Sequence, residues 1–98
     1  MEIQKNANGS KLDVALKGRL DTTTAPELEG SLKGDIGTLT ELVFDFKDLE
    51  YISSAGLRVL LSCQKTMNKQ GSMKITNVNE TIKDIFEVTG FSDILTIE

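Results

Sequence analysis

Hydrophobic positions alternate with polar ones in the first part of the chain. Every second residue from Leu12 to Leu16 is a large apolar one, and the charged residues of the segment from Lys11 to Lys17 lie on the opposite side. Met1 to Lys5 shows a weaker form of the same pattern. Asn8-Gly9, between the two segments, favours a tight turn because both residues tolerate positive φ. The opening of the chain therefore predicts an antiparallel hairpin.

The spacing of apolar residues then changes to three or four. The stripe from Ala25 to Leu32 predicts a helix that Gly34 and Gly37 end. The segment Thr24-Ala25-Pro26-Glu27 is typical of a helix start, since threonine can cap, proline suits the first turn and glutamate completes a capping box. Gly30 lies inside this helix and lowers its stability, and the pattern gives no purpose for it.

The rest of the chain continues as strands separated by helices. Glu41 to Phe46 predicts a strand with its leucine and phenylalanines inward, followed by a loop from Lys47 to Ser53. A helix is predicted from about Ser54 to Asn68, ended by Gly71. The remaining predictions are a strand at Met73 and Ile75, a helix capped by Asn79 and followed by Gly90, and a short final strand from Ile94 to Ile97.

This order, β-β-α-β-α-β-α-β, predicts an α/β fold over residues 1–98 as one domain. Strands separated by helices pair in parallel through right-handed crossovers, so the sheet is mostly parallel with an antiparallel opening hairpin. Strands buried on both faces are apolar throughout, whereas these alternate. We therefore expect the helices mainly on one face of the sheet.

Composition narrows the function classes. A net charge of −4 argues against direct nucleic-acid binding and against docking on an anionic membrane. No apolar stretch approaches the length of a spanning helix, and the first residues lack the pattern of a signal peptide. The expectation is a cytoplasmic protein without membrane insertion.

The residue types also bear on catalysis. The single cysteine, Cys63, excludes an internal disulfide and lies in an apolar helical run, which favours a buried structural thiol. The chain has no histidine, and so lacks the usual general base, the commonest zinc ligand and any Ser-His triad. We expect no enzyme activity, no metal and no cofactor.

A small polar run, Ser53-Ser54-Ala55-Gly56, lies between a predicted strand and the longest predicted helix. This position is the carboxyl edge of the sheet, where α/β proteins tend to place their sites. The residues alone also allow a purely structural interpretation, in which the serines cap the helix and Ala55 and Gly56 permit close packing.

Three segments resemble the STAS domains of anti-sigma factor antagonists. Ile52-Ser53-Ser54-Ala55-Gly56-Leu57 is similar to the family's signature, and Gly18-Arg19-Leu20-Asp21 resembles its Gly-x-Leu-Asp element. Phe86-Glu87-Val88-Thr89-Gly90-Phe91 resembles the end of its last helix. The three occur in the family's order, and the resemblance covers essentially the whole chain.

The resemblance implies a phosphorylation switch. Aligned on Gly56, the family phosphoacceptor falls on Ser54. The unphosphorylated protein would bind an anti-sigma serine kinase, phosphorylation would release it, and a serine phosphatase would reset the switch. Many members have Asp where this chain has Ser53, and Ser or Thr where it has Ala55. Ser53 is therefore a second candidate acceptor.

A partner-binding surface around this acceptor is implied as well. Its expected residues are Asp21, Thr22, Thr23, Ser53, Ser54, Ala55, Gly56, Leu57 and Arg58. Arg58 also begins a predicted exposed ridge with Ser62, Lys65 and Lys69, which either docks an acidic partner or is only a solvated face. An alternative function within the family is a scaffold of a stress-signalling assembly or an accessory subunit of a membrane transporter.

Overall fold

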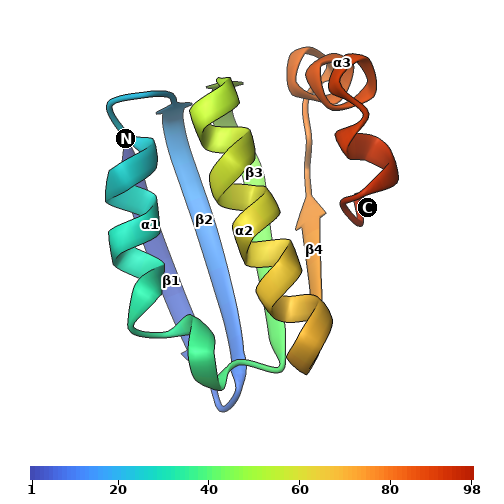
Figure 1. Cartoon of the computed structure of the whole chain (residues 1–98). Helices are drawn as coiled ribbons and strands as arrows, with labels where there is room; N and C mark the ends of the chain where they lie inside the picture. The colour runs from blue at the N-terminus through green and yellow to red at the C-terminus, as the bar shows by residue number, and fades with distance from the viewer.

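The computed structural model describes all 98 residues and contains a four-stranded sheet in the order β1-β2-β3-β4 (Figure 1). The strands are β1 (Glu2–Asn8), β2 (Lys11–Leu20), β3 (Glu41–Ile52) and β4 (Ser72–Thr76). β1 pairs antiparallel with β2, whereas β2–β3 and β3–β4 are parallel. The predicted hairpin is confirmed, and Gly9 in its turn has a φ of 64°.

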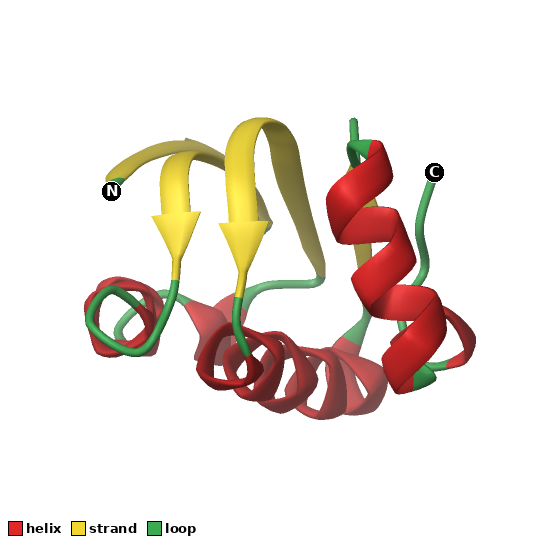
Figure 2. Ribbon diagram, turned by 90° about the horizontal axis from the view of Figure 1, so that it is seen from above, coloured by secondary structure: helices red, strands yellow, loops and turns green.

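The helices gather on one side of this sheet. They are α1 (Ala25–Lys33), α2 (Ser54–Gln70) and α3 (Glu80–Thr89). Figure 2 shows α1 and α2 lying side by side under the sheet, while α3 stands beside the β4 edge. The apolar stripes of these elements enclose a core cluster of 23 buried residues. The predicted fold class and the placement of the helices are confirmed.

β3 is longer than the sequence pattern predicts. The segment from Lys47 to Ile52, expected as loop, continues the strand. Its pairing with β2 shifts register twice, between Ala15 and Lys17 and between Gly18 and Arg19. Each shift places an extra residue in β3, so Leu49 and Ile52 return to the buried face although strict alternation fails. The prediction of a loop there was wrong because it relied on alternation alone.

The expected last strand is reduced to one bridge. Phe91–Asp93 forms a 3-10 turn, η2, and the amides of Ile94 and Leu95 donate back to the Phe91 carbonyl. A single parallel bridge joins Ile97 to Ile75 of β4, made by the Ile75 amide donating to the Thr96 carbonyl and the Glu98 amide donating to the Ile75 carbonyl, both at 2.9 Å. Leu95 is buried and Ile97 packs against the core, whereas Ile94 is exposed, so the segment adds to the core more than to the sheet.

Candidate functional site

The candidate site lies where β2 and β3 end next to each other. Leu20 pairs with Ile52, and the Ser53 amide donates to the Leu20 carbonyl at 2.9 Å. From this edge β2 leads through Asp21–Thr24 into α1, and β3 leads through Ser53 into α2 (Figure 1). The two helix N-termini are therefore brought to the same end of the sheet, as the parallel order predicts.

The two serines at the start of α2 have different surroundings. Ser54 is the first residue of the helix and is exposed. Ser53 is half-buried, and its hydroxyl oxygen is fully buried without a hydrogen-bond partner. Ser53 occupies the cap position, with φ −99° and ψ 177°, but its side chain accepts no hydrogen bond from the helix. The hydroxyl that solvent and partners can reach is that of Ser54.

Gly56 lies where the start of α2 packs most closely against the sheet. A Cβ atom at this position would lie 2.7 Å from Ile52 Cγ1 and 2.8 Å from Leu20 Cγ. Gly56 and Leu57 are both buried, whereas Ala55 is half-buried. Gly56 and Leu57, both expected in the partner surface, are therefore buried. They let the start of α2 pack closely against β2 and β3.

Asp21 organises the turn before α1. Its Oδ1 accepts hydrogen bonds from the backbone amides of Thr23 and Thr24 at 3.0 and 3.1 Å and from the Thr23 hydroxyl at 2.7 Å. These hydrogen bonds, the Thr23 hydroxyl first, lower the pKa of Asp21 from its ordinary value of 3.8. Asp21 is therefore held as a carboxylate at the site.

Thr24 does not form the capping box expected with Glu27. It has helical φ and ψ and makes no side-chain cap, because its hydroxyl donates to the Arg19 carbonyl at 2.8 Å and accepts from the Asp21 amide. The turn is instead stabilised from Asp21, three residues earlier. A sequence signal for this existed, since Asp-Thr-Thr is typical of a side-chain turn.

A depression separates the N-terminal parts of α1 and α2. It has a volume of about 330 Å³ and is lined by Thr22, Ala25, Pro26, Glu29, Ala55 and Arg58. Three of these, Thr22, Ala55 and Arg58, are expected partner-binding residues. The exposed Glu29 was not anticipated, because helical spacing does not tell which flank of α1 faces α2.

Arg58 also begins the ridge predicted along α2. All four of its side chains, Arg58, Ser62, Lys65 and Lys69, are exposed. On the opposite face of the sheet, the exposed Arg19 side chain stacks over the Tyr51 ring, with 4.7 Å between guanidinium carbon and ring centroid. Sequence reasoning missed this pair because Tyr51 was placed in a loop.

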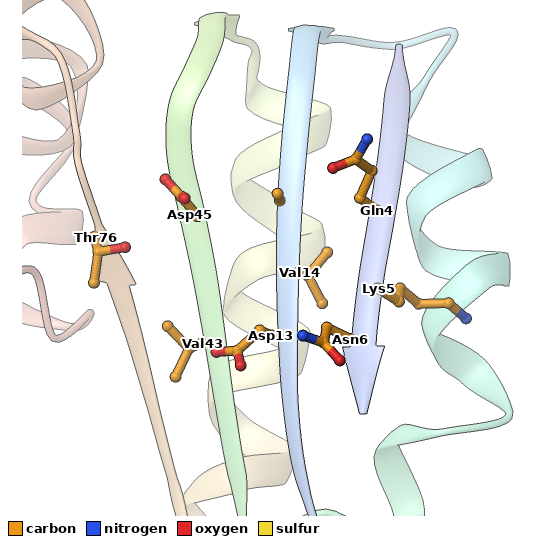
Figure 3. Close-up of a pocket in the computed structure, with 9 residues that line it drawn as sticks. Gln4, Lys5, Asn6, Asp13, Val14, Val43, Asp45 and Thr76 are labelled. Atoms are coloured by element: carbon orange, nitrogen blue, oxygen red, sulfur yellow. The ribbon is translucent and has the colours of Figure 1, made fainter. Parts of the chain in front are cut away.

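The helix-free face of the sheet carries a second shallow pocket, of about 370 Å³. Figure 3 shows Gln4 and Asn6 of β1, Asp13 of β2 and Asp45 of β3 among its lining residues. Asp45 Oδ1 accepts from the Lys47 amide and from Asn77 Nδ2 at 2.9 and 3.0 Å. This carboxylate thus stabilises the local backbone, and nothing in the pocket pairs it with a nucleophile.

Comparison with known proteins identifies the family. The sequence pattern of the STAS domain family matches residues 2–98 of the chain. The chain belongs to the STAS domain family. This membership agrees with the mixed sheet, with the signature segment at the start of α2 and with the Gly-x-Leu-Asp element at the end of β2. No helix of this STAS domain is long and apolar enough to cross a membrane.

A related protein and two solved structures agree with this family. The anti-sigma-B factor antagonist of Bacillus subtilis (strain 168) is 32% identical over 98 residues, covering 99% of this chain and 88% of that protein. The fold matches SpoIIAA, an anti-sigma factor antagonist solved in its unphosphorylated form, with a TM-score of 0.79 and 18% identity over 99% of this chain and 87% of that one. An anti-sigma factor antagonist from Mycobacterium paratuberculosis matches with a TM-score of 0.88 and 20% identity, over 98% and 83% of the two chains.

Proposed function

We propose that this STAS domain, over residues 1–98, is an anti-sigma factor antagonist that phosphorylation on Ser54 switches off. In the unphosphorylated state it binds an anti-sigma factor that is also a serine kinase. Phosphorylation by that kinase releases the partner, and a serine phosphatase restores binding. The role places the protein in the cytoplasm and requires no catalysis by the chain itself.

The observation that carries this proposal is the contrast between the two serine hydroxyls. Ser54 is exposed at the first position of α2, one residue before Ala55, which lines the depression between α1 and α2, while the Ser53 hydroxyl is buried. A kinase needs an accessible hydroxyl, so Ser54 is favoured over Ser53. The B. subtilis relative, named as an anti-sigma-B factor antagonist, supports the class of partner.

The proposed partner surface lies beside Ser54, on the turn before α1 and on the first turns of α2. We assign to it the exposed Thr22 and Thr23 of the turn held by Asp21, and Ala55 and Arg58 of α2. Ser53, Gly56 and Leu57 contribute by positioning the start of α2. In this arrangement a partner contacts a small neutral hydroxyl.

Phosphorylation changes this surface without disturbing the fold. A phosphoserine carries about −1.5 to −2 charges at neutral pH. That charge is favourable at a helix N-terminus, where the backbone amides are free and the helix dipole is positive. It therefore acts on binding, through bulk and charge in an interface shaped for a hydroxyl. We expect partner affinity to fall at least about tenfold, or about 1.4 kcal/mol, with no decrease in melting temperature.

The acceptor is tested with two alanine variants. Ser54→Ala and Ser53→Ala are incubated with the anti-sigma serine kinase and ATP, and intact mass is measured. We expect Ser53→Ala to gain one phosphate and Ser54→Ala to gain none. Phosphate still appearing on Ser54→Ala contradicts the assignment, and a melting temperature clearly lowered by phosphorylation contradicts the mechanism.

A further inference from the structure

Arg58 is a cation without an acidic partner. The ion pairs of the structure join Lys5 to Asp35, Lys11 to Glu41, Arg19 to Asp21 and Lys74 to Glu98. Arg58 is exposed and takes part in none of them. It is also the one cation that lines the depression between α1 and α2.

The position of Arg58 on α2 directs its side chain toward Ser54. The two residues are four apart, which places them one above the other on a helix with about 5–6 Å between their Cβ atoms. Helical side chains lean toward the N-terminus, so the long Arg58 side chain is able to reach back over the turn that begins with Ser54. An acidic group preceding a basic one by four residues is also the favourable orientation for an ion pair.

We propose that a phosphate on Ser54 is bound by the Arg58 guanidinium of the same helix. This inference rests on the proposed function, because it concerns the phosphorylated state of the same site. The planar guanidinium matches phosphate oxygens with two parallel hydrogen bonds, and the free amides at the start of α2 complete the site. Phosphorylation then has two effects on a partner: it adds a negative charge, and it withdraws the cation of the depression.

No neighbouring carboxylate forms an ion pair with Arg58, so its guanidinium is available to a phosphate on Ser54. Glu29 of α1 lines the same depression, but neither oxygen of its carboxylate lies within 4.0 Å of the Arg58 guanidinium, the limit for an ion pair. The Asp21 carboxylate is engaged by Thr23 and Thr24.

Arg19, the other nearby cation, is held elsewhere. It precedes Leu20, which is buried on the helix side, so its own side chain projects from the opposite face of the sheet, where it stacks on Tyr51 and its Nε lies 4.0 Å from Asp21 Oδ2.

The test measures the phosphate directly and needs no kinase. Phosphoserine is installed at position 54 during synthesis of the full chain, and ³¹P NMR follows its second ionisation with pH. A bound guanidinium favours the dianion and lowers this pKa. We expect Arg58→Gln to raise the phosphate pKa by about 0.2–0.4 unit, the shift that corresponds to the free energy of a helical ion pair of this spacing.

Two matched variants separate specific binding from general charge. Lys65→Gln removes a cation from the same ridge two turns away, and Arg19→Gln removes the cation on the opposite face; we expect the phosphate pKa to stay within error of the parent in both. No change in Arg58→Gln, or an equal rise in all three variants, overturns the proposal. Arg58→Met, which keeps the length of the aliphatic stem, repeats the test should the glutamine variant fold poorly.

These outcomes are separable from those of the proposed function. A chain that no anti-sigma kinase phosphorylates still reports the contact between Arg58 and an installed phosphoserine. Conversely, an unchanged phosphate pKa in Arg58→Gln overturns the contact alone and leaves phosphorylation of Ser54 by the kinase in place.

Discussion

Gly56 is the residue whose lack of a side chain matters most to the site. It lets the first turn of α2 approach Leu20 and Ile52 so closely that a Cβ atom has no room. Because the start of α2 carries Ser54, this contact also fixes where the candidate acceptor lies relative to the turn before α1. The glycine therefore acts on function through position.

Gly56→Ala is predicted to destabilise the protein by about 1–2 kcal/mol. Overpacking costs about 1–3 kcal/mol, and alanine regains up to about 1 kcal/mol as a better helix former. Urea unfolding measures the change. Gly30→Ala on α1 is the control, because nothing lies within 4 Å of a Cβ there, and it should stabilise by about 0.5–1 kcal/mol. Changes of the same sign would contradict the packing argument.

Asp21 is predicted to make stability depend on acid pH. Its pKa is lowered in the folded protein by hydrogen bonds from Thr23 and Thr24. A lowered folded pKa gives stability that is present above the unfolded value of 3.8 and lost as the pH falls through the folded pKa. Asp21→Asn should therefore be less stable than the parent at neutral pH, and the difference should shrink in acid.

Urea unfolding at several pH values measures this difference. Asp84→Asn on α3 corrects for the loss of one charge, since the Asp84 side chain makes no hydrogen bond in the structure. A difference between parent and Asp21→Asn that stays constant from neutral pH into acid would count against the assigned hydrogen bonds. The carboxyl NMR signal of Asp21 should titrate below 3.8.

At the scale of elements, α3 is attached to the sheet through its cap. Asn79 Oδ1 accepts from the Ile82 amide at 2.9 Å, and its Nδ2 donates to the Leu49 carbonyl at 2.8 Å. The second bond is available because β3 continues past Phe46, which brings Leu49 alongside the start of α3. One side chain thus both begins the helix and ties it to the extended part of β3.

Asn79→Ala is predicted to destabilise the protein by about 1–2 kcal/mol, since it removes a cap and leaves the Leu49 carbonyl without its donor. Asn79→Ser keeps a cap oxygen and loses the donor to Leu49 without placing a second oxygen against that carbonyl, so its loss should be smaller. Thermal unfolding of both variants measures the order. Equal losses would show that the bond to Leu49 carries most of the effect.

At the scale of the whole molecule, Cys63 reports on the integrity of the core. Its side chain is buried in the core cluster, and burial, with the charge of Glu29 adding to it, raises the pKa of the thiol from 9.0 to about 11. In the folded protein at about pH 8 only a small fraction is thiolate, the reactive form.

Iodoacetamide should alkylate native Cys63 at least about a hundredfold more slowly than free cysteine at about pH 8, and at an ordinary rate in denaturant. Intact mass against time measures the rate. Gly56→Ala should speed the native reaction and Gly30→Ala should not, because opening of the fold exposes the thiol. Rapid alkylation of the native parent would contradict the buried position of Cys63.

Much of the fold was predictable because its signals are local. The hairpin at Asn8-Gly9, the cap at Asn79 and the end of α3 at Gly90, where φ is 81°, follow from the preferences of single residues. The end of β3 was not predictable in the same way. Its bulges depend on the pairing with β2, and a bulge breaks the alternation from which a strand is recognised.

The amino-acid sequence determined the order and direction of the elements, and so placed Ser53-Ser54-Ala55-Gly56 at the carboxyl edge of the sheet. Only the tertiary structure decided that the Ser53 hydroxyl is buried and Ser54 exposed. It also decided that Glu29 and Arg58 line one depression. The reason is physical: periodicity within a segment fixes which residues share a face, whereas the register of β2 on β3 and the packing of α1 beside α2 fix what each face meets.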